Sequence, residues 1–116
     1  MSKVYDLEDR TLKFAKDVYA FVKKLPKTIS NIETQKQLVR SAGSVGANYI
    51  EANESLGKKD FQMRIRISRK EAKESRYWLR LVEAADGDVV ELERLIQEST
   101  ELMKIFGAIL QKSIDK

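Results

Sequence analysis

Residues Ser41–Ala52 read S-A-G-S-V-G-A-N-Y-I-E-A and include two glycines, three alanines and two serines. The apolar spacing on both sides of this stretch predicts that it lies within a long helix, where a glycine costs about 1 kcal/mol relative to alanine. Small residues kept at such a cost indicate that another backbone approaches closely. The stretch therefore predicts close packing and assembly, and it indicates no chemistry.

Apolar residues recur at helical spacing along the whole chain and predict four helices. The helices are expected over about residues 6–25, 32–55, 59–85 and 88–113. Pro26 ends the first helix, because its ring cannot continue one. Ser30 and Glu33 have the spacing of a capping box for the second helix, and Asn31 is the alternative cap. Gly87 is expected to follow the C-terminus of the third helix.

Short connections between the predicted helices place successive helices antiparallel. The predicted fold class is therefore all-α, an antiparallel up-down-up-down four-helix bundle, with residues 1–116 as a single domain. The predicted core stripes are Leu7, Phe14, Val18, Phe21, Val22 and Leu25 on the first helix, Leu38, Ala42, Val45, Tyr49, Ala52 and Leu56 on the second, Phe61, Ile65, Ser68, Ala72, Leu79 and Val82 on the third, and Leu92, Leu95, Ile96, Met103, Phe106 and Leu110 on the fourth.

Composition excludes several classes of protein. The chain contains no histidine and no cysteine, so it lacks the commonest general base, the commonest transition-metal ligand and any disulfide. No apolar run is long enough to span a membrane, and the N-terminus lacks the apolar segment of a secretory signal. We therefore expect no metal, no cofactor and no membrane association, with a cytoplasmic location as the default.

Three carboxylates, Glu51, Glu71 and Glu74, flank the predicted seam between the second and third helices, together with Ser44, Asn48 and Lys70. A di-iron bundle would carry Glu-x-x-His on two helices, and that motif is absent. We therefore interpret the carboxylates as members of polar networks and expect no catalytic residue. Asn48 is expected to hydrogen-bond a neighbouring helix, since a buried amide must be satisfied. An enzyme with a carboxylate site remains the least favoured hypothesis.

Apolar surface remains after one core is filled. Gly43, Gly46, Ala47 and Ile50 form a small face on the second helix, a second flank of the third helix is apolar, and Leu102, Ile105 and Ile109 lie beside the core stripe of the fourth. A helix that is apolar on two sides buries both, and large apolar patches mark interaction sites. The predicted oligomer interface consists of Gly43, Ala47, Ile50, Met63, Ile67, Trp78 and Leu81. The alternative is packing of these residues within one bundle.

Positive charge is concentrated in the third helix. Lys58–Arg80 contains nine bases and three acids, whereas Glu83–Met103 contains one base and seven acids. Five bases recur at steps of three and four residues and form one acid-free stripe, the basic ridge: Arg66, Arg69, Lys73, Arg76 and Arg80. Such a ridge suits nucleic acid, because contacts from Lys and Arg release phosphate counterions. Tyr77 is the only aromatic residue near it, so base stacking is not indicated.

Two other interpretations of the basic ridge stay open. It is either a solvated helix face, or a face paired with the acidic helix of the same or a neighbouring subunit.

The run R-S-A-G-S-V-G-A-N-Y-I-E-A at Arg40–Ala52 resembles the signature of the four-helix-bundle proteins encoded in intervening sequences of bacterial 23S ribosomal RNA genes. K-K-D-F at Lys58–Phe61, R-K-E-A-K-E at Arg69–Glu74 and Y-W-L at Tyr77–Leu79 fit the same pattern. The resemblance covers about residues 5–110. It implies an antiparallel bundle that assembles as a ring-shaped homopentamer, in a family without an established catalytic activity. A related branch serves diversity-generating retroelements, and its accessory proteins are thought to bind the reverse transcriptase and nucleic acid.

We therefore expect a non-enzymatic, oligomeric bundle that binds nucleic acid or a ribonucleoprotein partner through the basic ridge. The expected partners are further copies of the chain, RNA or DNA, and a nucleic-acid-processing protein. The alternative is a protein–protein scaffold in which the basic helix meets the acidic Glu83–Met103 region of a neighbour, with no nucleic-acid role.

Overall fold

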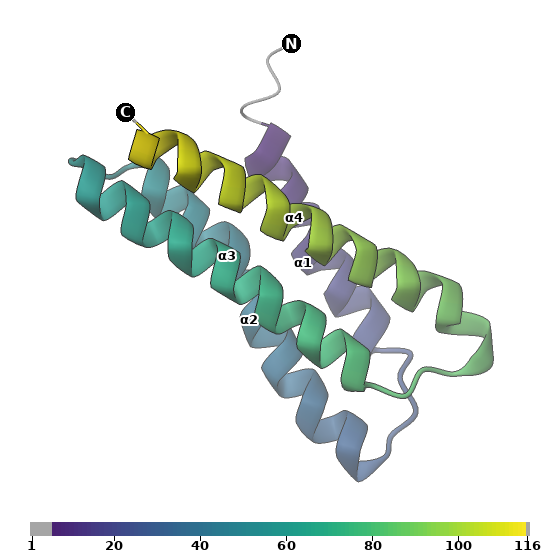
Figure 1. The fold of residues 1–116 in the computed structure, drawn as a ribbon. Coiled ribbons are helices and arrows are strands. Elements are labelled where there is room, and N and C mark those ends of the chain that lie inside the picture. Colours follow the sequence, from purple (N-terminus) through teal and green to yellow (C-terminus); the bar gives the residue numbers. More distant parts are fainter. Residues whose placement is uncertain (1–5, 116) are drawn as a thin grey trace.

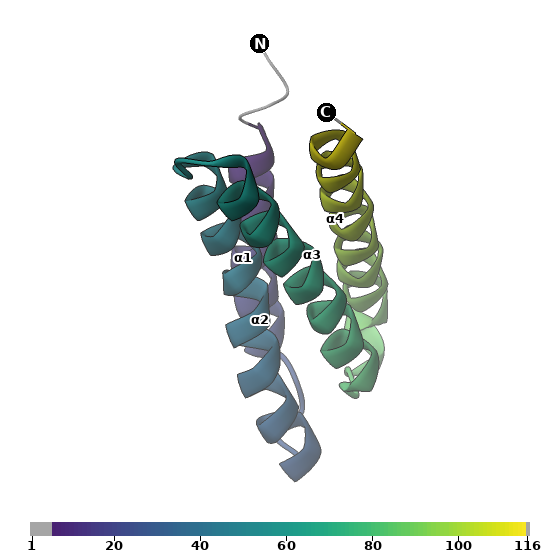
Figure 2. The ribbon, with the colours of Figure 1, turned by 60° about the vertical axis from the view of Figure 1, so that its left-hand side comes forward.

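A computed structural model describes residues 6–115, which form four long helices (Figure 1). These are α1 (Asp6–Val22), α2 (Ile29–Asn53), α3 (Lys58–Leu81) and α4 (Val89–Asp115), with a short 3-10 helix, η1 (Asp86–Asp88), directly before α4. Successive helices run antiparallel, and α3 lies between α2 and α4 (Figure 2). Contacts between α1 and α4 close the ring around the core. The predicted all-α four-helix bundle is confirmed.

The core consists largely of the residues that helical spacing predicts. Phe14, Val18, Leu38 and Ile65 are among its fully buried side chains. Two predictions about the core are wrong. Leu56 is fully exposed, because α2 ends at Asn53 and leaves Leu56 in the turn before α3. Leu102, which was expected beside the α4 stripe, is fully buried at its centre.

The helix ends show what the tertiary structure adds to local signals. Thr28 caps α2 in place of Ser30 or Asn31, since its side chain accepts a hydrogen bond from the backbone N–H of Asn31. As a result, α2 begins three residues earlier than predicted. The third helix ends at Leu81 instead of residue 85, because Val82 is extended and buried. Gly87 consequently lies in η1 and does not terminate α3.

Asn31 ties two loops together at one end of the bundle. Its side chain is only 1% exposed. The amide nitrogen donates to the carbonyl oxygens of Pro26 at 2.9 Å and Glu83 at 3.0 Å, while the amide oxygen accepts from the backbone N–H of Glu83 at 2.9 Å. These bonds hold the chain after α3 against the start of α2, which explains why α3 stops early.

The small residues of α2 pack against α1. A Cβ atom built at Gly46 would lie 2.8 Å from Oγ1 and 3.1 Å from Cβ of Thr11, which is too close for any side chain. One built at Gly43 would lie 3.9 Å from the hydroxyl of Tyr19, an ordinary contact. The close backbone approach predicted for this stretch therefore occurs at Gly46, within the bundle. Ala47 and Ile50, on the same small face, remain exposed.

Candidate nucleic-acid interface

The basic ridge lies along the side of α3 that adjoins α4. Arg66, Arg69, Lys73 and Arg80 are exposed, and Arg76 is half-buried. Arg76 Nη1 donates to Thr100 Oγ1 on α4 at 3.5 Å, and Arg69 Nε lies 4.0 Å from the position of a Cβ at Gly107. The ridge spans about 21 Å of the helix, at about 1.5 Å per residue. Two of its arginines therefore lie over the α3–α4 seam, and the others project from α3.

Within residues 6–115, none of the five ridge side chains forms an ion pair. Acids from η1 and α4 pair with bases of α1 and the loop that follows it: Glu98 with Arg10 at 2.7 Å, and Asp88 with Lys24 at 3.3 Å. The interpretation that the ridge is paired with the acidic helix of its own subunit is therefore wrong for the described residues. Four of the five ridge side chains are exposed and carry no ionic partner within the described residues.

Arg94 is the centre of the ionic contact between α4 and α1. Its guanidinium donates to Glu91 at 2.9 Å and to Asp17 at 3.0 Å. The hydrogen bond from Arg94 lowers the pKa of Glu91 below its usual value. Burial raises the pKa of Asp17, but hydrogen bonds from Lys13 and Arg94 outweigh it, so the pKa of Asp17 is lowered overall. Asp17 therefore joins α1 to α4 through Arg94, whereas Glu91 holds the same guanidinium from within α4.

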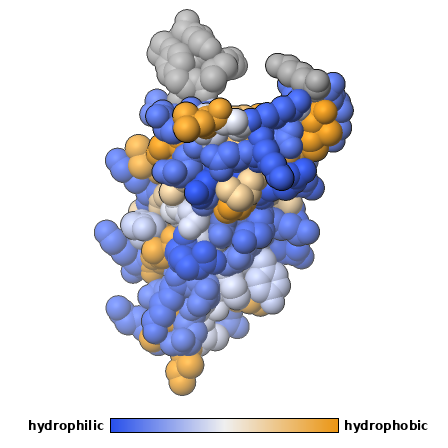
Figure 3. All heavy atoms as spheres, turned by 90° about the vertical axis from the view of Figure 1, so that its left-hand side faces the viewer, coloured by the Kyte–Doolittle hydropathy of each residue, from blue (hydrophilic) through white to orange (hydrophobic). Residues whose placement is uncertain are grey.

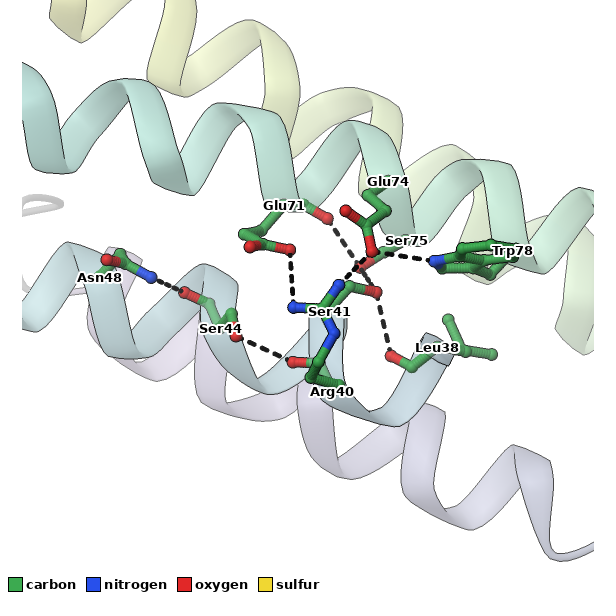
Figure 4. Close-up of polar contacts among 9 residues, drawn as sticks. All are labelled: Leu38, Arg40, Ser41, Ser44, Asn48, Glu71, Glu74, Ser75 and Trp78. Carbon is green, nitrogen blue, oxygen red and sulfur yellow. Dashed lines mark hydrogen bonds and ion pairs between the residues drawn. The ribbon is translucent and has the colours of Figure 1, made fainter. Parts of the chain in front are cut away.

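A polar seam joins α2 to α3 (Figure 4). Arg40 on α2 lies against two carboxylates of α3: its Nη1 is 3.5 Å from Glu71 Oε1, and its Nη2 pairs with Glu74 Oε2. The same oxygen of Glu74 accepts from Trp78 Nε1 at 3.1 Å. Glu71 is buried, and Glu74 is half-buried. Arg40 thus links two of the three predicted carboxylates, whereas the third, Glu51, is exposed.

Buried hydroxyls continue the seam. Ser75 Oγ lies 2.9 Å from both Ser41 Oγ and the carbonyl oxygen of Glu71, and Ser41 Oγ donates to the carbonyl of Leu38 at 3.2 Å (Figure 4). Asn48 Oδ1 accepts from Arg64 Nη1 of α3 at 3.1 Å, which confirms the expected bond to a neighbouring helix. Every buried side-chain nitrogen and oxygen of the described part has a partner. The seam therefore leaves no buried side-chain nitrogen or oxygen without a partner in residues 6–115.

Neither a metal cluster nor a membrane span occurs in the part of the chain that the structure describes. No group of three or more carboxylates there could hold a metal ion. None of the helices in residues 6–115 is long and apolar enough to cross a membrane.

The predicted oligomer-interface residues are distributed over two surfaces. Met63, Ile67, Trp78 and Leu81 lie on the outer flank of α3, whereas Gly43 faces α1. Met63 is 44%, Leu81 48% and Ile50 49% exposed; Trp78 packs against the core. Figure 3 shows that the face on the left of Figure 1 is mostly hydrophilic, with separate apolar patches. An interface built from these patches stays a prediction.

Residues 4–108 match the model of the 23S rRNA-intervening sequence protein family. The chain belongs to this family. A solved structure, described as a protein of unknown function from the S23 ribosomal protein family of Bacteroides thetaiotaomicron, superposes with a TM-score of 0.77. The two sequences are 28% identical, over 95% of this chain and 99% of that chain. No curated protein matches. The family resemblance drawn from Arg40–Ala52 is thus confirmed.

Proposed function

We propose that this 23S rRNA-intervening sequence protein is a non-enzymatic, oligomeric bundle that binds nucleic acid, or a ribonucleoprotein partner, through the basic ridge. The observation that carries the proposal is that no ridge side chain forms an ion pair in residues 6–115, while acids of α4 and η1 pair with bases of α1 and of the loop that follows it. Each phosphate that a ridge base contacts would release counterions, which is the main source of sequence-independent affinity. The proposal includes a cytoplasmic location, where nucleic acid and its processing proteins would be met.

Self-association forms part of this proposal, with a pentamer as the state that the family resemblance implies. The exposed apolar side chains of Met63, Leu81 and Ile50 support an interface. A ring would repeat the ridge around its axis and would raise the positive potential that a polyanion meets.

The test is a charge reversal of the ridge with a matched control. Arg69→Glu combined with Arg76→Glu brings the net charge of +4 to zero. Lys16→Glu combined with Lys23→Glu makes the same change at exposed positions in or just after α1, a helix that does not pack against α3. We expect the ridge variant to lose affinity for a labelled oligonucleotide and to flatten the salt dependence, and the control to retain most of both. Equal effects of the two variants would contradict the proposal.

The second candidate function is a protein–protein scaffold. It is favoured by one observation: Glu83, Asp86 and Glu93 are exposed and form no ion pair in residues 6–115, so a neighbour's ridge could meet them. Light scattering of the ridge variant separates the candidates. A variant that assembles normally but no longer binds nucleic acid supports the proposed function. If the oligomer of the variant dissociates, and the wild-type protein binds no nucleic acid, the scaffold function is supported.

A further inference from the structure

Tyr77 is an exposed aromatic residue at the edge of the basic ridge. Its side chain lies on α3 with 56% of its surface exposed. Lys73 precedes it by four residues and Arg80 follows it by three, and residues at these spacings are neighbours on a helix surface. The aromatic ring of Tyr77 therefore lies between two basic side chains of the ridge.

A chain of contacts reaching back to α2 orients this ring. Tyr77 packs edge-on against Trp78, with ring centroids 5.0 Å apart and an interplanar angle of 71°. Trp78 is in turn held by its hydrogen bond to Glu74, and Glu74 by its ion pair with Arg40 of α2 (Figure 4). The tyrosine is thus supported on one side and open to solvent on the other, which reduces the rotamer freedom that a ligand would have to remove.

Building on the proposed function, we infer that the ligand of the ridge is single-stranded nucleic acid and that Tyr77 stacks on one of its unpaired bases. Proteins bind single strands by combining positively charged side chains, which follow the phosphates, with aromatic side chains on which the nucleobases stack. In a duplex the nucleobases stack on one another, so a ring on a protein surface has no free base face on which to stack. The sequence argues against stacking because aromatics do not alternate with the ridge bases; the support from Trp78 is visible only in the structure.

Binding of a fluorescently labelled oligo-uridine, an oligo-thymidine and a thymidine–adenosine duplex tests the inference by anisotropy. We expect Tyr77→Ala to bind both single strands about 5- to 160-fold more weakly, and to bind the duplex as the wild type does. Tyr77→Phe keeps the ring and should retain the affinity. Tyr19→Ala is the matched control, since Tyr19 is similarly exposed, at 47%, but lies on α1. Far-UV circular dichroism verifies that each variant is folded.

The possible results separate this inference from the proposed function. One result is that Tyr77→Ala loses affinity only for the single strands, and binds a strand with abasic positions as the wild type does. That result supports both the stacking inference and the proposed function. The stacking inference is overturned if Tyr77→Ala leaves binding unchanged, or if it weakens binding of the duplex and the single strands equally. If the ridge reversal weakens binding in that case, the proposed function stands. If the wild-type protein binds none of the three probes at low salt, the proposed function fails and the inference fails with it.

Discussion

Replacing Gly46 by alanine is expected to destabilise the bundle, although replacing Gly43, three residues earlier, is expected to stabilise it. Both changes add a methyl group inside α2, and each gains about 1 kcal/mol of helix propensity. The two sites differ in what the methyl group meets. At Gly46 it would lie 2.8 Å from Thr11 Oγ1, whereas at Gly43 the nearest atom is the Tyr19 hydroxyl at 3.9 Å.

The expected magnitude follows from how little Thr11 can yield. Thr11 is 1% exposed, its β-branched side chain is stiff, and its hydroxyl donates to the carbonyl of Glu8 at 2.9 Å. Overpacking at such a site costs about 1–3 kcal/mol. Subtracting the propensity gain leaves Gly46→Ala up to about 2 kcal/mol less stable than the wild type. Gly43→Ala should be about 1 kcal/mol more stable, so the two variants differ by about 1–3 kcal/mol.

Urea unfolding followed by far-UV circular dichroism measures both variants, at one protein concentration and with the oligomeric state verified by light scattering. A Thr11→Ala background provides the decisive control, because it removes the hydroxyl oxygen that lies closest to the new methyl group. Gly46→Ala should cost less in that background than in the wild type, which gives a favourable coupling energy. If Gly46→Ala stabilises the protein as much as Gly43→Ala does, the reasoning about the α1–α2 approach is refuted.

Two further predictions concern the contacts that hold the helices and loops together. Asp17 and Glu91 have lowered pKa values in the folded protein, so their stabilising effect is complete above their ordinary values of 3.8 and 4.5 and is lost as the pH falls through the lowered values. Arg94→Gln should therefore flatten the pH dependence of urea unfolding below about pH 4.5, and parallel curves for variant and wild type would count against this account. Asn31→Ala should lower the free energy of unfolding by about 1–3 kcal/mol, since buried backbone groups lose their partner. Asn53→Ala, at an exposed amide, should change it by less than about 0.5 kcal/mol, and similar losses at both sites would exclude the proposed role of Asn31.

Helices and core stripes could be predicted from the sequence because they depend on local spacing. Phe14, Val18 and Phe21 recur with the helical period, and all three are fully buried. The early end of α3 could not be predicted in this way. It depends on hydrogen bonds between Asn31 and Glu83, which are 52 residues apart in the chain. Asn31 itself looks like an ordinary helix cap in the sequence, so its role as a tie between loops was missed.

In the candidate site, too, local features could be predicted from the sequence, whereas contacts between helices could not. The basic ridge is a local pattern on one helix, and its five residues do share one side of α3. Which acids neutralise which bases depends on the register between helices: Glu98 pairs with Arg10 across the bundle, 88 residues away in the chain. Arg40, the residue that joins Glu71 and Glu74, gave no sequence signal as their partner, because only the packing of α2 on α3 brings it there.

The salt dependence of nucleic-acid binding tests the central claim most directly. The association constant of the purified wild-type protein for a single-stranded oligonucleotide would be measured over a range of salt concentrations. If all five ridge bases contact phosphates, a plot of log K against log salt should have a slope of about −3.5 per ridge, at about −0.7 for each contact on a single strand. A slope near zero, or no binding at low salt, would contradict the claim that the ridge of α3 binds nucleic acid.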